Sequence, residues 1–281
     1  MRNKICLVVL NYNDYVTTES FIKNIENYKS IDTAIVIDNK SNNDSFDKLK
    51  KYNRNNIFVY QSDHNGGYNY GNKFGLNEMI RLGEYKYFII SNPDVIFEED
   101  TIIKMYNTLE NNDKIGLIAP IMINRDKTKN YKSVWKIPNA LNYILFSFKY
   151  LGFFSRKFMY YSKNELIKPG IKIVDCVAGS FYMMRTDAYM DAKPFDTNLF
   201  LYCEETVSGI QLRKAGWKVA VDRDITFLHD HSTSIDKTFN KFSQRKIMWK
   251  SRIYVLEKYF NLNLFEKWIV SRIKNYYELK F

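Results

Sequence analysis

The first third of the chain repeats one pattern: a short apolar run ends in a polar cluster and is followed by a segment with helical spacing. The apolar runs are Ile5–Leu10, Ala34–Ile37, Ile57–Gln61 and Tyr87–Ile90. Their length and their β-branched and aromatic residues predict buried strands. Helices are predicted between them over Thr17–Tyr28, Asp44–Tyr52 and Tyr68–Leu82. This order predicts an α/β fold with a doubly wound, mostly parallel sheet.

The polar clusters stand at the carboxyl ends of the predicted strands, the edge at which open α/β sheets bind ligands. After the fourth run, Asn92 and Asp94 flank Pro93, which ends the strand. Their oxygens suit a divalent cation of the Mg²⁺ or Mn²⁺ type. The alternative is a simple turn in which Asp94 bonds its own backbone. No GxGxxG follows the first run, so the sequence lacks the Rossmann dinucleotide fingerprint.

The positive charge is concentrated in two segments. The chain of 281 residues has a net charge of +11, and residues 127–172 carry ten Lys or Arg against one acid, while residues 236–281 carry eleven against four. Each segment also holds eleven aromatic residues. Interleaved cations and aromatics indicate an anionic membrane surface or a nucleic acid. No helix-turn-helix, RNP or zinc spacing supports nucleic-acid binding.

The second half of the chain gives less regular signals. The predicted elements are a helix at Glu99–Leu109, a strand at Gly116–Pro120, one helix over Ala140–Phe154, a helix at Ile210–Ala215, and strands at Val219–Asp222 and Ile225–Leu228. Apolar residues then recur at helical spacing, at Trp249, Ile253, Leu256 and Phe260, and at Phe265, Ile269, Ile273 and Tyr276. We therefore expect a domain over 1–235, interrupted by the basic aromatic insertion 127–172, and a basic amphipathic helical tail over 236–281.

Eight stretches stand in a familiar order over residues 5 to about 234. They are LVVLNYN (7–13), AIVIDNKSNNDS (34–45), NGGYNYGNKFG (65–75), FIISNPDV (88–95), AGSFYMMR (178–185), PFDTNLFLYCEE (194–205), LRKAGWKV (212–219) and FLHDHSTS (227–234). With them the chain resembles the family 2 glycosyltransferases, in the rhamnosyltransferase-like branch that builds bacterial surface polysaccharides. The resemblance implies a GT-A fold with a nucleotide-binding half and an acceptor-binding half. It also implies inverting transfer of a sugar from a nucleotide diphosphate to an acceptor hydroxyl.

The resemblance assigns a nucleotide-binding group: Asn11, Tyr12, Asn13, Asp38, Asn65, Gly66 and Asn92. Asp38 matches the acid that reads the nucleobase. A carboxylate accepts the N3–H of uracil or thymine, so a UDP- or dTDP-sugar is favoured over a CDP-sugar, whose base lacks that donor. The alternative role of Asp38 is an Asx turn after a strand.

The resemblance also implies metal-binding and catalytic residues. Asp94 matches the second acid of the family's DxD motif, and Asn92 stands where many members have Asp. His229, five residues before Ser234, matches a histidine that completes the Mn²⁺ or Mg²⁺ shell. Glu205 matches the catalytic base and Glu204 its neighbour or orienter; the alternative is that both are acids stabilised at a helix N-terminus.

Further expectations concern the sugar side of the site, the redox compartment and the partners. Gly179 and Ser180 match the donor and acceptor sugar side of the site, and Val207 stands where the family pattern has an acid. Three cysteines without metal or CxxC spacing suit a reducing cytoplasm. We expect a cytoplasmic protein, peripheral on the inner face of the membrane, with a glycan or lipid-linked acceptor and no nucleic-acid partner. The alternative is a nucleotide-sugar-binding protein that has lost catalysis.

Overall fold

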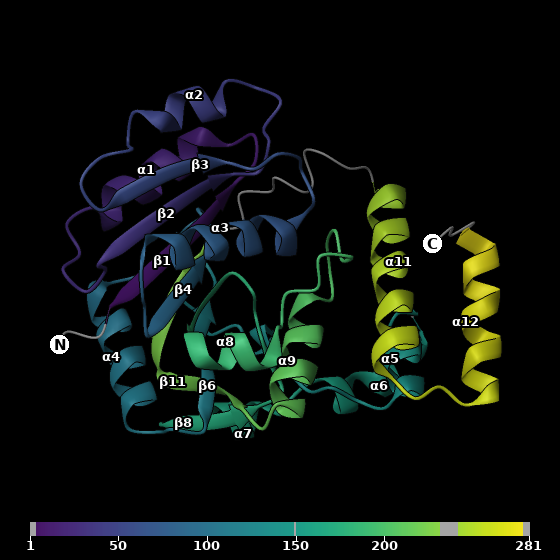
Figure 1. The fold of residues 1–281 in the computed structure, drawn as a ribbon. Helices are drawn as coiled ribbons and strands as arrows, with labels where there is room; N and C mark the ends of the chain where they lie inside the picture. Colours follow the sequence, from purple (N-terminus) through teal and green to yellow (C-terminus); the bar gives the residue numbers. More distant parts are fainter. Residues whose placement is uncertain (1–3, 149, 231–240, 278–281) are drawn as a thin grey trace.

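The computed structural model describes residues 4–148, 150–230 and 241–277, and within them a nine-stranded mixed sheet forms the centre of the molecule (Figure 1). Neighbouring strands follow the order β3-β2-β1-β4-β10-β6-β11-β5, and β8 also pairs with β11. The strands are β1 (Ile5–Asn11), β2 (Thr33–Asp38), β3 (Ile57–Gln61), β4 (Tyr87–Ser91), β5 (Val95–Ile96), β6 (Ile115–Ile123), β8 (Ile171–Val174), β10 (Phe181–Arg185) and β11 (Lys218–His229).

The first half of the sheet has the predicted alternation. Strands β1 to β4 run parallel, and the helices between and after them are α1 (Tyr15–Ile25), α2 (Ser45–Lys50), α3 (Tyr68–Leu82) and α4 (Glu99–Glu110). Each predicted strand in this half is confirmed to within one residue at either end. The sheet becomes mixed at β10, which is antiparallel to both β4 and β6.

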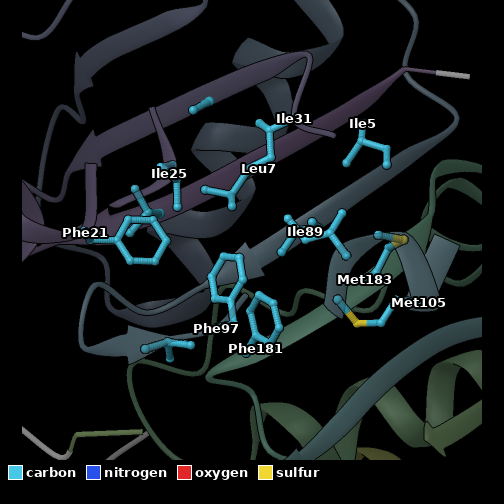
Figure 2. Packing of buried hydrophobic residues seen from close by; sticks show 14 of the residues in the cluster. Ile5, Leu7, Phe21, Ile25, Ile31, Ile89, Phe97, Met105, Phe181 and Met183 are labelled. Atoms are coloured by element: carbon cyan, nitrogen blue, oxygen red, sulfur yellow. The ribbon is translucent and has the colours of Figure 1, made fainter. Parts of the chain in front are cut away.

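Both faces of the first strands are buried, which explains why their sequences are continuously apolar. On one face Leu7 and Val9 of β1 pack in a cluster with Phe21 of α1, part of which Figure 2 shows. On the other face Cys6 and Val8 belong to a second cluster with residues of α3. The sheet is therefore a rigid central layer between two hydrophobic cores.

The half of the domain from β6 to β11, which the resemblance expects to bind the acceptor, is called the acceptor-side half below. It differs from two of the predicted boundaries. The two strands expected over Val219–Asp222 and Ile225–Leu228 form the single strand β11, whose pairing with β6 shifts register between Asp222 and Thr226. The helix expected at Ile210–Ala215 is α9 (Glu204–Lys214), which begins earlier than predicted. The sequence pattern missed this start because the first turn is polar and carries no apolar periodicity. The short helix α8 (Thr186–Ala192) follows β10.

The insertion contains the one helix prediction that was wrong. Ala140–Phe154 does not form one helix: α5 (Ala140–Leu145) ends and α6 (Leu151–Met159) begins after a turn. A Cβ on Gly152 would lie 2.7 Å from the carbonyl oxygen of Phe146, so the turn depends on a close backbone approach that glycine allows. The other insertion elements are the 3₁₀ turn η1 (Tyr131–Ser133), α7 (Lys163–Ile167), and β7 (Val134–Trp135), which pairs with β9 (Cys176–Val177).

The tail forms two helices, α11 (Lys241–Tyr259) and α12 (Leu264–Tyr277), and Figure 1 shows α12 outside α11. Trp249, Ile253 and Leu256 of α11 are buried, as their spacing predicts. In α12 only part of the predicted stripe is buried, since Ile273 is buried while Phe265 and Tyr276 are exposed. The expected boundary between 235 and 236 lies outside the described residues.

One carboxylate fixes α11 to the acceptor-side half. Asp196 accepts hydrogen bonds from Tyr254, Lys258 and Tyr259, at 2.9, 2.9 and 2.7 Å. Burial alone would raise the pKa of Asp196, but the bonds from Lys258 and Tyr259 hold it well below its usual range. None of the helices formed by the described residues combines the length and the apolar character that a bilayer crossing requires.

Candidate active site

The sheet topology brings the predicted polar clusters to one edge. Asn11 and Asp38 are register partners at the ends of β1 and β2. Ser91, which ends β4, pairs with Phe181, which begins β10 directly after Ser180. Strand β11 ends at His229, opposite Val95. The ends of six strands therefore meet at this edge, although their residues span most of the chain.

At the ends of β1 and β2, Asp38 is fully buried and accepts four hydrogen bonds. The donors are the Asn11 side chain at 2.8 Å, the Ser41 backbone and hydroxyl at 2.9 and 2.6 Å, and the Gln61 side chain at 3.1 Å. A nucleobase can reach this carboxylate only if one of these donors moves away. The sequence interpretation missed Ser41 and Gln61, because neither side chain indicates nucleotide binding on its own.

Ser41 also joins the first two strand-end loops. Its hydroxyl accepts a hydrogen bond from the backbone N–H of Asn13 at 2.8 Å, and Asn13 has a left-handed backbone with φ of 58°. The Asn13 side chain accepts in turn from the Asn42 N–H at 3.0 Å. Tyr12 is half-buried in this loop. The predicted residues at 11, 12, 13 and 38 thus belong to one connected unit.

The glycine loop before α3 connects that unit to the acceptor side. The buried Asn39 donates to the Asn65 side chain at 3.0 Å and to the Gly67 carbonyl at 3.1 Å. Gly67 has φ of +88°, and a Cβ there would lie 1.9 Å from the carbonyl oxygen of Phe200. A Cβ on Gly66 would overlap the ring of Tyr70. These glycines therefore permit close contact between the loop and the 194–203 segment.

Asp94 and His229 lie side by side at this edge. His229 Nε2 lies 3.1 Å from Asp94 Oδ1, and each side chain is 12% exposed. The backbone N–H of Asp230 donates to the Asp94 carbonyl at 2.9 Å. The backbone N–H of Asn92 donates to the Ser180 carbonyl at 2.8 Å, so the Asn-Pro-Asp turn also contacts the start of β10.

The donor set at this pair fits a divalent cation whose shell is completed by its substrate. Within the described part of the chain, no three His, Cys, Asp or Glu side chains form a ready-made metal site. One carboxylate and one imidazole at 3.1 Å can share an ion, because Mg²⁺ is commonly held by one or two carboxylates with the remaining positions taken by water and substrate phosphates. Asp94 and His229 would hold the ion, and Asn92 stands two residues before Asp94.

Glu204 and Glu205 open helix α9, which is the position that the alternative to the catalytic assignment gave them. Glu205 Oε1 accepts a hydrogen bond from the backbone N–H of Gly179 at 3.2 Å. Burial and the neighbouring Glu205 carboxylate raise the pKa of Glu204 to about 8, and burial raises the pKa of Glu205. Glu204 Oε1 is buried without a hydrogen-bond partner among the described residues. Two buried adjacent carboxyls disfavour double ionisation, so this pair holds a proton readily.

Tyr68 links the glycine loop to this acid pair. Its hydroxyl donates to the Gly179 carbonyl at 2.6 Å, while the Gly179 N–H bonds Glu205. The side chains of Tyr68, Glu204 and Glu205 line a cavity of about 20 Å³, which is enough for one water molecule. The Ser180 hydroxyl is buried without a partner among the described residues. Tyr68 is a third residue that the sequence interpretation missed.

Val207, where the resemblance leads one to expect an acid, is fully buried. It belongs to the apolar cluster that includes Trp249 and Ile253 of α11. The position therefore serves to attach the tail helix to the acceptor-side half.

Comparisons with known proteins agree with this geometry. The chain is 28% identical over 146 residues to rhamnosyltransferase WbbL of Escherichia coli K12, covering 50% of this chain and 51% of that protein. It is 26% identical over 152 residues to the N-acetylglucosaminyl-diphospho-decaprenol L-rhamnosyltransferase of Mycobacterium tuberculosis, covering 53% and 48%. The chain thus spans about half the length of the curated relatives it matches.

Solved structures share the fold at low sequence identity. The mannosyltransferase PcManGT from Pyrobaculum calidifontis, in complex with GDP-Man and Mn²⁺, matches with a TM-score of 0.60 at 11% identity, over 99% of this chain and 71% of that one. The residues 1–349 of S. aureus TarS match with a TM-score of 0.55 at 12% identity, over 97% and 71%. The fold is that of the GT-A glycosyltransferases. The model of the family described as glycosyl transferase family 2 matches residues 6–189, and this chain belongs to that family.

Proposed function

We propose that the chain is an inverting, metal-dependent glycosyltransferase that moves a sugar from a UDP- or dTDP-sugar to a hydroxyl of a glycan or lipid-linked acceptor. Rhamnose is the first candidate sugar, because the curated relatives are rhamnosyltransferases. The observation that carries the proposal is the connection of the Asp38, Asp94 and Glu205 segments at one sheet edge. Hydrogen bonds of Asn39, Tyr68 and Gly179 link the loop after Asp38 to Glu205. The bond from the Asn92 N–H to the Ser180 carbonyl links the Asp94 turn to the same segment. The alternative of an inactive binding protein has no comparable support.

In this proposal Glu205 is the general base. Its carboxylate takes the proton of the acceptor hydroxyl as the acceptor oxygen bonds the anomeric carbon. The bond between that carbon and the diphosphate breaks at the same time, and its electron pair leaves with the nucleotide. The Gly179 N–H donates to the Glu205 carboxylate at 3.2 Å and holds it in place. The raised pKa of Glu205 makes this carboxylate a better base than an exposed glutamate.

Asp94 and His229 serve the leaving group. They would hold a divalent cation, Mn²⁺ or Mg²⁺, which when bound would stabilise the negative charge of the nucleotide diphosphate. The nucleotide contacts the loop residues Asn11, Tyr12 and Asn13 on one side and Asn65 and Gly66 on the other. The sugar lies beside Gly179 and Ser180. Asp38 acts in base recognition through its network with Ser41 and Gln61, which a uracil or thymine N3–H would have to enter.

The cellular setting follows from the same comparison. We propose that the protein works in bacterial surface polysaccharide synthesis, for a capsule or the cell wall, in the cytoplasm at the inner face of the membrane. One curated relative is named for a diphospho-decaprenol-linked acceptor, which is a lipid. The 127–172 segment and the tail supply the positive charge that an anionic membrane attracts.

A donor screen tests the function. The full chain is incubated with UDP-, dTDP-, GDP- and CDP-sugars in Mn²⁺, and nucleotide release is measured with and without chelator. We expect release from a UDP- or dTDP-sugar that stops when the cation is removed. Release from a GDP- or CDP-sugar alone would overturn the assignment of Asp38, and absence of release from every donor together with measurable donor binding would favour the inactive binding protein.

A further inference from the structure

Two adjoining cavities lie between the insertion and the tail helices. The larger, about 460 Å³, is lined by residues of α11 and α12 that include Trp249, Trp268 and Arg272. The smaller, about 320 Å³, is lined by insertion residues that include Arg156. Both are lined by Ser147, Phe148 and Arg245, so they form one continuous depression. We call it the aromatic groove.

The groove is cationic. Lys132, Arg156, Arg245 and Arg272 line it, and the described lining residues include no Asp or Glu. The guanidinium carbon of Arg272 lies over the ring of Trp268, 5.5 Å from the ring centre, which is a cation–π contact. Arginine keeps its charge at every physiological pH and matches phosphate oxygens geometrically. The charge and the donors therefore favour a phosphate group.

The rim of the groove is apolar. Phe153 and Phe154 of α6 are 67% and 73% exposed, and Leu264, Phe265 and Tyr276 at the two ends of α12 are 85%, 59% and 79% exposed. Exposed phenylalanine and leucine beside arginine and tryptophan are typical of helices that lie in a lipid interface. Free phosphate would satisfy the arginines but would leave this apolar rim in water. An amphiphile with a phosphate and alkyl chains satisfies both.

We propose that the aromatic groove binds the phosphate headgroup of an anionic bilayer phospholipid, with the lipid chains against the aromatic walls and the rim of α6 and α12 in the interface. The proposal deepens the membrane part of the proposed function, on which it rests for its biological setting. It assigns membrane binding to one defined site, whereas the sequence indicated only two basic segments.

The site is rigidly connected to the acceptor side of the active site. Trp249, which lines the groove, belongs to the buried cluster that contains Leu199 and Val207. The Ser251 hydroxyl donates to the Leu201 carbonyl at 2.6 Å, and Asp196 holds the far end of α11. A lipid bound in the groove therefore fixes the orientation of the 194–205 segment relative to the membrane.

Vesicle sedimentation with the full chain tests the proposal. Binding is measured to phosphatidylglycerol and to phosphatidylcholine vesicles, for the wild type, for Arg245→Gln/Arg272→Gln, and for a control with the same charge loss, Lys73→Gln/Lys218→Gln, whose lysines are exposed on the catalytic domain. We expect about thirtyfold weaker phosphatidylglycerol binding for the groove variant, since two surface-proximal charges contribute about 1 kcal/mol each. For the control we expect a loss of less than about twofold. Equal loss in both variants would overturn the groove as the site.

A second measurement distinguishes the occupants. Short-chain phosphatidylglycerol, inorganic phosphate and a single-stranded RNA are each titrated while tryptophan fluorescence is followed, because Trp249 and Trp268 line the groove. We expect a saturable change with the short-chain lipid that Arg245→Gln/Arg272→Gln abolishes. An equal response to inorganic phosphate, or tighter binding of RNA that the same variant abolishes, would contradict the lipid assignment.

Donor turnover separates this proposal from the proposed function. The groove variant should release nucleotide from a soluble donor at the wild-type rate, because its arginines do not line the sheet edge. If the wild type binds lipid but turns over no donor, the proposed function fails and the groove remains. If it turns over donor but shows no preference for phosphatidylglycerol over phosphatidylcholine, the groove proposal fails alone.

Discussion

His229 Nε2 lies 3.1 Å from Asp94 Oδ1, although 135 residues separate the two along the chain. The contact exists because β11 ends where the two-residue strand β5 pairs with it, His229 opposite Val95. A carboxylate and an imidazole held this close can share one cation. The pairing of β5 with β11 therefore joins the Asn-Pro-Asp turn to the acceptor-side half.

The first prediction concerns this pair. Asp94→Asn replaces a charged ligand with a neutral one, and we expect the affinity for UDP in Mn²⁺ to fall about 100-fold, since even outer-shell losses cost 10–100-fold at metal sites. Calorimetric titration measures it. Without the cation, the variant and the wild type should bind UDP equally weakly. Asp100→Asn, at an exposed carboxylate that pairs with Lys104, is the matched control. Unchanged Mn²⁺-dependent binding in Asp94→Asn would exclude Asp94 as a ligand.

Tyr68 is predicted to position the base. Tyr68→Phe removes the hydroxyl that donates to the Gly179 carbonyl, so the glycine whose N–H bonds Glu205 loses one of its two anchors. We expect kcat to fall about tenfold, corresponding to about 1.4 kcal/mol, with a smaller change in the donor KM. Tyr70→Phe, whose hydroxyl bonds the exposed Asp63, should leave both constants unchanged. Equal kinetic effects of the two substitutions would remove this role.

The acid pair makes stability depend on pH. Because the pKa of Glu204 is raised to about 8, the folded state binds its proton more tightly than the unfolded state does. The contribution of protonated Glu204 to the free energy of unfolding is therefore complete below the ordinary glutamate pKa and is lost as pH rises toward 8. The Glu204→Gln side chain resembles the protonated acid and does not titrate. Between pH 5 and pH 8 the unfolding free energy of the variant should therefore rise relative to that of the wild type, by on the order of a few kcal/mol. Urea denaturation at both pH values measures this, and parallel changes in the two proteins would contradict it.

The attachment of α11 depends on Asp196. Asp196→Asn weakens the charge-assisted bonds from Lys258, Tyr254 and Tyr259, and we expect a loss of about 2–3 kcal/mol in unfolding free energy, the range for hydrogen bonds to a charged group. Faster amide hydrogen exchange should follow in α11. Glu257→Gln, which breaks the more exposed pair with Lys274, should cost less than about 1 kcal/mol. Slow exchange in α11 of Asp196→Asn would show that the buried cluster alone holds the helix.

Local pattern predicted the nucleotide-side half well. The continuous apolar runs of β1, β2 and β4 reflect burial on both faces of the sheet, so sequence alone located them. The polar residue that follows each strand is then placed at the sheet edge by the parallel topology itself. The meeting of Asp94 with His229 could be expected from this rule together with the resemblance.

The rest depends on contacts between distant segments. Nothing near Asp196 in sequence indicates Tyr254 or Tyr259, which reach it only once α11 has packed. The helical spacing in α12 predicted a helix but not which side faces the domain, because that depends on where α11 lies. Ser41 and Gln61 were missed for the same reason, since their role is defined by a carboxylate on another strand end.

The most direct test of the account is the separation of donor binding from turnover in Glu205→Gln. The donor is the sugar nucleotide selected by the screen, its binding in Mn²⁺ is measured by calorimetry, and nucleotide release is followed in the same buffer. Loss of a general base costs about 10²–10⁴-fold in rate. The account predicts a fall of that size in nucleotide release with donor affinity within about twofold of the wild type. Release at the wild-type rate would contradict it.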